Sequence, residues 1–227
     1  MFAGRDYEPY AKERDKEIKE LAKENNIEFN LVKEHVLMHQ DEVTKSDDEP
    51  YLVYTPYMKT WKEQVLEKSD SGHIQDSYYL QSYPVNLKKK NIITHDYTIP
   101  DLGEMGFKRG EYDVVSTKID KQVIKHYDEK RDYPALEATS RLSVHLRFGT
   151  LSIRKLARTA AGLNETFLDE LIWRDFYSMI LDHYPKVVNN EFREKYSGIP
   201  WENDKELFKA WKEGKTGFAL VDAGMRQ

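Results

Sequence analysis

The sequence has no cysteine among its 227 residues. This absence excludes disulfide bonds, thiolate nucleophiles and cysteine-ligated metal sites. The sequence also has no apolar run that approaches the roughly 20 residues of a membrane-spanning helix. The opening Met1 to Asp6 does not have the pattern of a signal peptide. We therefore expect a cytoplasmic protein that does not act at a membrane.

Hydrophobic residues are also scarce, at 39%, whereas charged residues reach 33%. Much of the buried apolar surface must then come from the aromatic residues, which make up 12%. The net charge of −5 argues against non-specific nucleic-acid binding by the chain as a whole. A local basic face remains compatible with binding, because association follows the local potential. The length suits one large domain or two small ones.

Residues 164–185 carry the strongest helical pattern in the sequence. Their apolar positions recur with the three-and-four spacing of one helix face, at Phe167, Leu168, Leu171, Ile172, Phe176, Met179 and Ile180. Asn164 or Thr166 can cap the start of the helix, and Pro185 ends it. The sequence therefore predicts a long helix with one buried face.

A second stripe of the same helix consists of Glu170, Trp173, Arg174 and Tyr177, which lie three or four residues apart. A carboxylate, an indole, a guanidinium and a phenol on one face could stack on a flat ring and hydrogen-bond its edge. The alternative is an ordinary solvated face with a Glu170–Arg174 ion pair and a half-buried Trp173. The stripe alone does not exclude that alternative.

The N-terminal part has the pattern of half an α/β unit. Residues 5–26 predict a charged amphipathic helix, which is followed by a strand at residues 27–36 with alternating Ile27, Phe29 and Leu31. A strand needs partners to pair with. The residues that follow provide too few strand candidates to build a sheet.

His35 and His39 are four residues apart and could suggest a pair of metal ligands. No carboxylate or third histidine falls at a convincing ligand spacing. We interpret both as ordinary surface histidines, and no metal site is predicted.

The middle of the chain contains two segments of distinct composition. Residues 50–57 combine two prolines with a short β-prone run, which predicts an extended segment and a helix that begins near Pro56. Residues 68–110 are polar and rich in glycine and proline, and they predict a connection between domains. The run Lys88–Lys90 is interpreted as a solvated face.

From Glu111 onward the pattern is helical. The sequence predicts one helix from Tyr112 to Arg131 and a second that is capped by Ser152. After the helix at residues 164–185, it predicts another from Asp204 to Trp211 and the opening of a further one at Val221.

Two turns in this region could hold a phosphate. Thr139–Ser143 offers three hydroxyls, several backbone N–H groups and a guanidinium, which suits a phosphate or diphosphate. A helix-capping turn is the alternative. Gly214–Gly217 lacks the full Walker pattern, so we interpret it as a connection between helices.

Four segments together resemble the flavin domain of DNA photolyases in their order and spacing. They read TSRLSVHLRFG at 139–149, ELIWRDFY at 170–177, WKEGKTG at 211–217 and VDAGMRQ at 221–227. The forms at 139–143 and 170–174 are closer to the class that repairs cyclobutane pyrimidine dimers than to the 6-4 class. Residues 6–15 and 51–61 resemble the end of the family's antenna domain.

The resemblance implies an α/β fragment followed by a mainly α-helical domain. Residues 1–68 would be the C-terminal part of the Rossmann-like antenna domain, 69–110 the interdomain linker, and 111–227 the N-terminal half of the helical FAD-binding domain. The start of the antenna domain and the end of the flavin domain have no counterpart in the sequence. We expect a monomer when the protein is complete, and we expect the chain by itself neither to hold flavin nor to repair DNA.

The resemblance also implies roles for individual residues. It places the FAD contacts at Tyr127, Thr139, Ser140, Arg141, Leu142, Ser143, Phe167 and Arg174. Glu170 and Trp173 would line the pocket that receives the flipped dimer. Arg174 and Tyr177 would also face the damaged DNA.

Two further residues match positions outside this pocket. Trp201 matches the outermost tryptophan of the family's electron-transfer chain. Glu8 matches a position that contacts a folate antenna, such as methenyltetrahydrofolate, in some members. The resemblance therefore implies FAD and, in addition, a folate or another antenna chromophore.

The function that the resemblance implies is light-driven repair of cyclobutane pyrimidine dimers in UV-damaged DNA by electron transfer from reduced FAD. A cryptochrome-type blue-light receptor on the same fold is one alternative, and an inactive truncated remnant is another. Glu170 together with Trp173 favours repair, because a receptor need not keep a dimer pocket.

Overall fold

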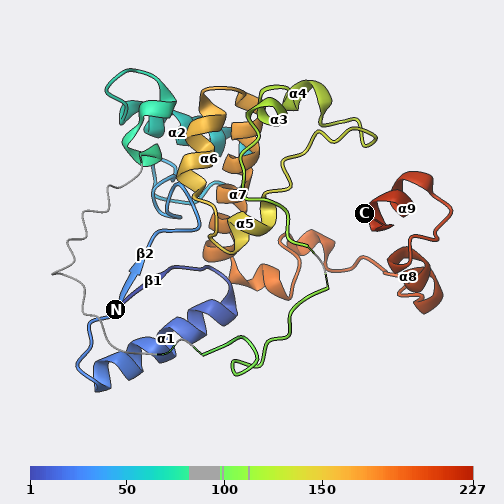
Figure 1. Ribbon diagram of the computed structural model, residues 1–227, viewed down its shortest axis with the longest axis horizontal. Coiled ribbons are helices and arrows are strands. Elements are labelled where there is room, and N and C mark those ends of the chain that lie inside the picture. The colour runs from blue at the N-terminus through green and yellow to red at the C-terminus, as the bar shows by residue number, and fades with distance from the viewer. Residues whose placement is uncertain (82–97, 99, 112, 227) are drawn as a thin grey trace. The chain divides into compact units, whose positions relative to one another are not determined.

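The computed structural model describes residues 1–81, 98, 100–111 and 113–226 of the chain (Figure 1). It divides into two compact units, Met1–Pro185 and Lys186–Gln227. The run Lys88–Lys90 lies outside the described residues, so its interpretation as a solvated face stays a prediction. None of the helices in the described ranges is long and apolar enough to cross a membrane.

The described part of the chain is mainly helical and has one small parallel sheet. The first unit contains β1 (Phe2–Gly4), α1 (Pro9–Glu24), β2 (Asn30–Val32), α2 (Tyr54–Glu67), α3 (Lys121–Lys125), α4 (Tyr127–Lys130), α5 (Ser143–Arg147), α6 (Ile153–Ala161) and α7 (Glu165–His183). The second contains α8 (Lys205–Lys212) and α9 (Ala219–Arg226). Short 3₁₀ helices lie at Ile74–Asp76, Tyr78–Leu80, Pro185–Val188 and Glu194–Tyr196. The predicted α/β fragment followed by helices is confirmed.

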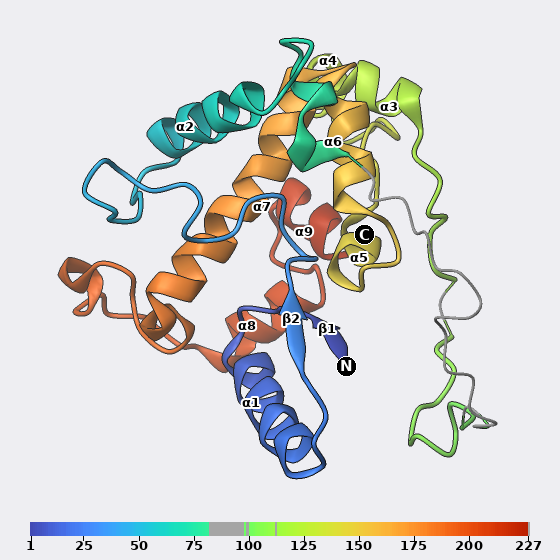
Figure 2. The same ribbon diagram turned by 90° about the vertical axis from the view of Figure 1, so that its left-hand side faces the viewer.

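The N-terminal part forms a β–α–β unit. Strands β1 and β2 pair in parallel, with Phe2 opposite Asn30, and α1 connects them (Figure 2). The predicted helix begins only at Pro9, because proline suits the first turn of a helix. It ends at Asn25 and Asn26, and Asn26 adopts a left-handed φ of 56°. Strand β1 was not predicted, because three residues are too short to show an alternating pattern.

Helix α7 packs against α2, α4 and α6 in the first unit (Figures 1 and 2). Every apolar residue of its predicted face is buried, namely Phe167, Leu168, Leu171, Ile172, Phe176, Met179 and Ile180. Asn164 is the cap, since its side chain accepts a 3.0 Å hydrogen bond from the Phe167 N–H. The helix ends at His183, two residues before Pro185. The prediction of a long helix with one buried face is confirmed.

The prediction of a single helix from Tyr112 to Arg131 was wrong. Helical structure starts only at Lys121, because the Asp120 side chain accepts hydrogen bonds from two backbone N–H groups and so caps a new helix there. Residues 113–120 have no regular structure. The β-branched residues among them disfavour a helix, because their side chains lose rotamer freedom against the preceding turn.

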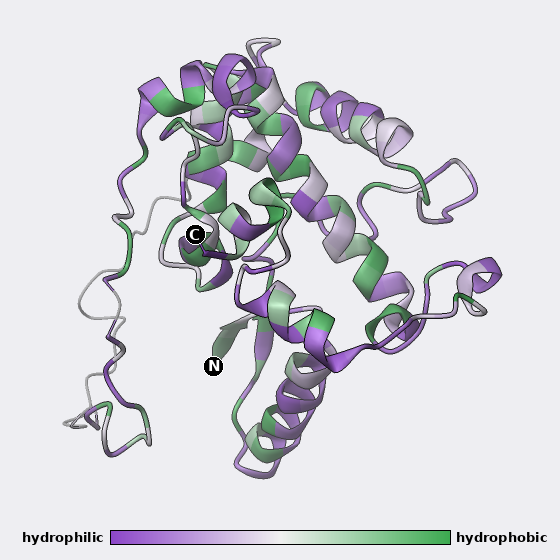
Figure 3. Cartoon of the chain, turned by 90° about the vertical axis from the view of Figure 1, so that its right-hand side faces the viewer, coloured by the Kyte–Doolittle hydropathy of each residue, from purple (hydrophilic) through white to green (hydrophobic). Residues whose placement is uncertain are grey.

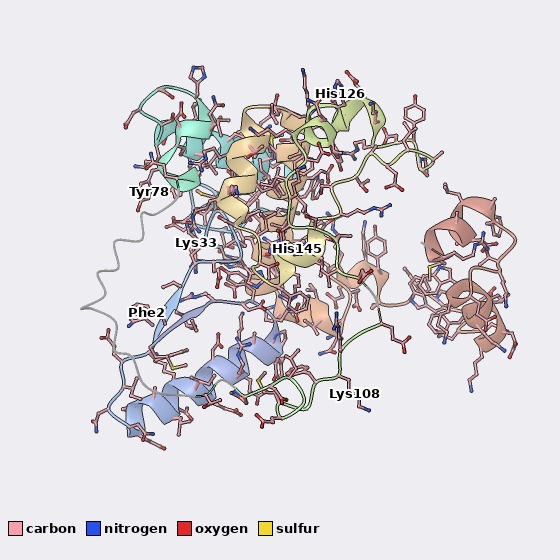
Figure 4. All side chains as sticks on the ribbon, in the orientation of Figure 1. Phe2, Lys33, Tyr78, Lys108, His126 and His145 are labelled. Atoms are coloured by element: carbon pink, nitrogen blue, oxygen red, sulfur yellow. The ribbon has the colours of Figure 1, made fainter. Side chains whose placement is uncertain are left out.

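The irregular residues before α3 are nevertheless attached to the first unit through His145 of α5. This side chain is only 6% exposed, and Figure 4 shows it among the side chains of that unit. Its Nε2 lies 2.6 Å from the carbonyl oxygen of Val115, and its Nδ1 lies 2.7 Å from the Thr150 hydroxyl. A carbonyl can only accept, so Nε2 carries the proton.

The predicted connection of residues 68–110 is folded where it begins. The 3₁₀ helices at Ile74–Asp76 and Tyr78–Leu80 both pack against α6. Leu80 is fully buried. The first residues of this segment therefore belong to the first unit, and the linker boundaries of 69 and 110 stay predictions.

The second unit is a pair of short helices joined by the Gly214–Gly217 turn. Asp204 caps α8 through the Leu207 N–H at 2.8 Å. The Asp222 carboxylate accepts hydrogen bonds from the Thr216 hydroxyl and from the N–H groups of Thr216 and Gly217. These donors are therefore already used, and the interpretation of the turn as a helix connection is confirmed.

Figure 3 shows that hydrophobic and hydrophilic residues alternate along the described helices.

Candidate functional site

The four residues of the second α7 stripe make different contacts. Trp173 stacks on Tyr177, with ring centroids 5.5 Å apart and an angle of 23° between the planes. Glu170 forms an ion pair with Arg131, and Arg174 points to other partners described below. The alternative of a Glu170–Arg174 pair is therefore not what the structure shows. Tyr177 is 63% exposed, so the aromatic pair is open to solvent on its Tyr177 side.

The predicted FAD contacts Tyr127 and Phe167 meet where α4 packs on the start of α7. Their ring centroids lie 5.0 Å apart in an edge-to-face arrangement. The guanidinium of Arg131 lies 5.2 Å from the Tyr127 ring, and the same side chain pairs with Glu170. Burial raises the pKa of Tyr127, and the charge of Glu170 adds to this rise. Three residues of the predicted site are thus neighbours, joined by Arg131, which sequence reasoning did not single out.

The hydroxyl-rich turn at 139–143 faces solvent. Thr139, Arg141 and Ser143 are exposed, whereas Leu142 is buried. Arg141 adopts a left-handed φ of 51°, and its guanidinium pairs with Glu137 at 2.6 Å. The turn therefore presents two hydroxyls and a cation to solvent, as a phosphate-binding turn would.

The guanidinium of Arg174 is hydrogen-bonded to other residues of the first unit. Its guanidinium donates to the carbonyl oxygens of His35 and Leu146, the latter at 3.3 Å, and lies 3.0 Å from Nδ1 of His35. A guanidinium can only donate, so Nδ1 accepts and the His35 proton is on Nε2. Burial lowers the pKa of His35, although Asp6 opposes this, and the neutral ring fits its role as acceptor. His35 is thus half-buried and paired, which corrects its interpretation as an ordinary surface histidine.

Glu8, Ser143 and Arg174 line one cavity of about 260 Å³. The Glu8 carboxylate lies 3.1 Å from the Arg147 guanidinium, which also contacts Asp6 at 2.9 Å. The predicted antenna residue therefore lies next to one end of the predicted FAD turn. No group of metal-ligating side chains is present in the described residues.

Trp201, the predicted outer electron-relay residue, belongs to the second unit. Its side chain is 74% exposed. An exposed indole can be reached by a dissolved reductant, as an outer relay residue must be. Its role stays a prediction.

Asp175 is the principal residue of α7 that sequence reasoning missed. It is 1% exposed and accepts hydrogen bonds from the backbone N–H groups of Leu37 and Met38 at 3.1 and 3.0 Å and from the Trp61 indole at 3.2 Å. Burial raises its pKa to about 6, although these hydrogen bonds oppose the rise. The signal in the sequence was a lone carboxylate within the apolar face of the helix. Its partners lie far away in the sequence and could not be read from it.

Known proteins match both ends of the chain. A family model described as DNA photolyase matches residues 1–73, and one described as the FAD binding domain of DNA photolyase matches residues 167–227. The deoxyribodipyrimidine photo-lyase of Alkalihalophilus pseudofirmus is 32% identical over 94% of this chain and 46% of its own length. That of a Synechococcus species is 28% identical over 100% of this chain and 51% of its own length.

Solved structures agree with these matches. A class III photolyase from Agrobacterium tumefaciens superposes with a TM-score of 0.71 at 25% identity, over 100% of this chain and 49% of that one. A Synechocystis cryptochrome has a TM-score of 0.63 at 19% identity, over 98% of this chain and 50% of that one, which shows a common fold alone.

The α/β unit, the helical part and the matched motifs define one class of protein, that of proteins with the photolyase fold. The chain belongs to the DNA photolyase family. It spans about half the length of the curated relatives that it matches.

Proposed function

We propose that the chain is part of a light-driven DNA-repair enzyme that splits cyclobutane pyrimidine dimers with reduced FAD. The observation that carries this proposal is the open aromatic pair Trp173–Tyr177 with the Glu170 carboxylate on the same helix face. The name deoxyribodipyrimidine photo-lyase, borne by curated relatives along the whole chain, supports it.

The turn at 139–143 has the groups that the diphosphate of FAD would need. The diphosphate of FAD is an anion, and the turn at 139–143 offers exposed hydroxyls of Thr139 and Ser143 and the Arg141 guanidinium. Among the described residues, the ion-pair partner of Arg141 is Glu137, a carboxylate that is 83% exposed. Such surface pairs are worth about 0–1 kcal/mol, so a phosphate can replace Glu137 at little cost.

Aromatic side chains complete this part of the proposed cofactor site. Tyr127 and Phe167 would contact FAD through their edge-to-face pair. Arg174, by contrast, already donates to two carbonyl oxygens and is mostly enclosed by protein. We therefore assign Arg174 to holding His35 against α7, instead of to binding FAD or DNA.

The α7 face suits a flipped pyrimidine dimer. Extruding a damaged base from the duplex costs roughly a few kcal/mol of lost stacking, and Trp173 and Tyr177 offer aromatic rings on which an extruded base can stack. Glu170 can accept a hydrogen bond from a base edge once it leaves Arg131. Both partners of that pair are about one-third exposed, so the exchange costs little.

When bound, reduced FAD would supply the electron that opens the dimer. The chain itself would hold the dimer beside the cofactor and exclude water from its bases. Trp201 would pass electrons from the surface to oxidised flavin. Glu8, at the cavity shared with Ser143 and Arg174, would contact an antenna chromophore.

The test compares binding of an oligonucleotide with one thymine dimer and of the same oligonucleotide without it. The purified, FAD-loaded protein that contains this chain should prefer the dimer. Glu170→Ala should weaken dimer binding by about 1.5–3 kcal/mol, or about 10- to 100-fold, and should retain flavin.

Glu165→Ala is the matched control, because it removes a carboxylate of the same helix that pairs with Lys62 and comes about two helical turns before Trp173. Equal affinity of the Glu170→Ala variant and the parent for the dimer would refute the assignment of Glu170. A protein that binds flavin but does not prefer the dimer would instead be a blue-light receptor on this fold. A protein that binds neither would be an inactive remnant.

A further inference from the structure

Tyr54, the first residue of α2, lies flat on the indole of Trp173. The ring centroids are 3.5 Å apart and the planes differ by 7°. Tyr54 also meets Phe176 edge-on, with centroids 5.9 Å apart. The ring of Tyr54 is thus in contact with two aromatic residues of α7, one of which is the proposed lesion-binding tryptophan.

The hydroxyl of Tyr54 fixes this arrangement. It donates a 2.8 Å hydrogen bond to the carbonyl oxygen of Asp169, one helical turn before Trp173. Burial raises the pKa of Tyr54, and the carboxylates of Asp169 and Glu170 add to the rise. The phenol therefore keeps its proton and remains a donor at neutral pH.

Helix α2 is also attached to α7 through a second side chain, Lys62, which contacts carboxylates and not the indole of Trp173. The Lys62 ammonium lies 2.7 Å from Glu165 and 2.5 Å from Asp169. The position of α2 along α7 is therefore set at two places. A variant at Lys62 can loosen this contact without touching the indole of Trp173.

Stacking on Tyr54 has a direct consequence for Trp173. One face of an indole can stack on only one ring at a time, so the face covered by Tyr54 is closed to a nucleobase. Tyr177 also stacks on the indole, with centroids 5.5 Å apart, and is itself largely exposed, so its ring is the part of this aromatic group that a planar ligand can reach. An indole held in place before binding also loses less conformational entropy when the ligand arrives.

We propose that Tyr54 is a positioning residue for Trp173, which fixes the indole and directs a flipped pyrimidine to the side of Tyr177. This inference rests on the proposed function. It extends the lesion site to the N-terminal half of the first unit, since α2 precedes all the helices that carry the other site residues.

The test uses the FAD-loaded protein and measures the ratio of its dissociation constants for undamaged and dimer-containing oligonucleotide. An aromatic pair is worth about 0.5–1.5 kcal/mol beyond its buried area, so Tyr54→Leu should lower this ratio by about 2- to 10-fold. Tyr54→Phe keeps the ring and should restore most of the ratio. Lys62→Met, which loosens the α2–α7 contact elsewhere, should leave the ratio unchanged.

The outcomes separate the two proposals. A parent protein that does not prefer the dimer refutes the proposed function. A parent that prefers it, together with an unchanged ratio in Tyr54→Leu, refutes the role of Tyr54. An equal loss in Tyr54→Leu and Lys62→Met also refutes it, because the effect would then be general loosening of the helices. If Tyr54→Leu does not fold, Tyr54→Met takes its place, and a ratio equal to that of the parent would overturn the inference.

Discussion

Asp175 provides a test of how the first unit is held together. Its carboxylate is buried where α7 meets the N-terminal segment. It accepts hydrogen bonds from the backbone N–H groups of Leu37 and Met38 and from the indole N–H of Trp61. The neighbouring Arg174 binds the carbonyl oxygen of His35. Two consecutive residues of α7 therefore hold one N-terminal segment, and Asp175 forms no ion pair with any of the residues that the structure describes.

The pH dependence of the free energy of unfolding follows from the pKa of Asp175, which burial raises from 3.8 to about 6. A raised pKa means that the folded protein holds the proton more tightly than the unfolded chain. Stability from this group is therefore fully present below about pH 4 and is lost as the pH rises through about 6. The whole rise corresponds to about 3 kcal/mol, of which about 2 kcal/mol falls between about pH 4.5 and 7.5.

The experiment is urea unfolding of the 227-residue chain and of Asp175→Asn across this pH range. Asparagine cannot ionise, so the free energy of unfolding of the parent should fall by about 2 kcal/mol relative to the variant as the pH rises. A constant offset between the two is also expected, because the amide N–H₂ gains no acceptor and costs about 1–3 kcal/mol.

Asp182→Asn on the same helix controls for the chemical change itself, since Asp182 pairs with Lys12 and is partly exposed. Parallel pH curves for the parent and Asp175→Asn would refute the reasoning. They would mean that Asp175 is ionised at the same pH in the folded and the unfolded chain, and hence that its three hydrogen bonds offset the cost of burial.

Two further predictions concern single side chains. Asn164→Ala should destabilise the chain by about 1 kcal/mol in urea unfolding, because the Phe167 N–H loses its cap; Asn164→Asp is the control that keeps an acceptor, and equal loss in both variants would contradict the capping role. Trp201→Phe in the FAD-loaded protein should slow the photoreduction of oxidised flavin and leave repair from chemically reduced flavin unchanged, whereas normal photoreduction would show that Trp201 is not a relay.

Local patterns in the sequence were enough to predict the longer helices α1, α2, α6, α7 and α8, whereas the predicted strand at 27–36 forms only at Asn30–Val32. The buried face of α7, its Asn164 cap and the Ser152 and Asp204 caps of α6 and α8 follow from residues within a few positions of one another. The secondary-structure prediction failed where an element was too short to show a pattern or where a capping residue started a new helix. Strand β1 has only three residues, and Asp120 starts a new helix inside a stretch that looked continuous.

For the candidate site, too, the sequence predicted what depends on local spacing and did not predict what depends on packing. Four motifs, at 139–149, 170–177, 211–217 and 221–227, together indicated the family, and the matches over residues 1–73 and 167–227 confirm it. The motifs did not predict which side chains contact one another. Glu170 pairs with Arg131 and not with Arg174, although the helical spacing suits Arg174 equally well.

The sequence by itself determined the α7 helix, its apolar face and the family motifs, because these depend on spacings of a few residues along the chain. Only the tertiary structure decided that Tyr54 covers one face of Trp173 and that Asp175 holds residues 37 and 38. These contacts join segments more than a hundred positions apart. Their geometry depends on how the helices pack, and packing is a property of all the segments together.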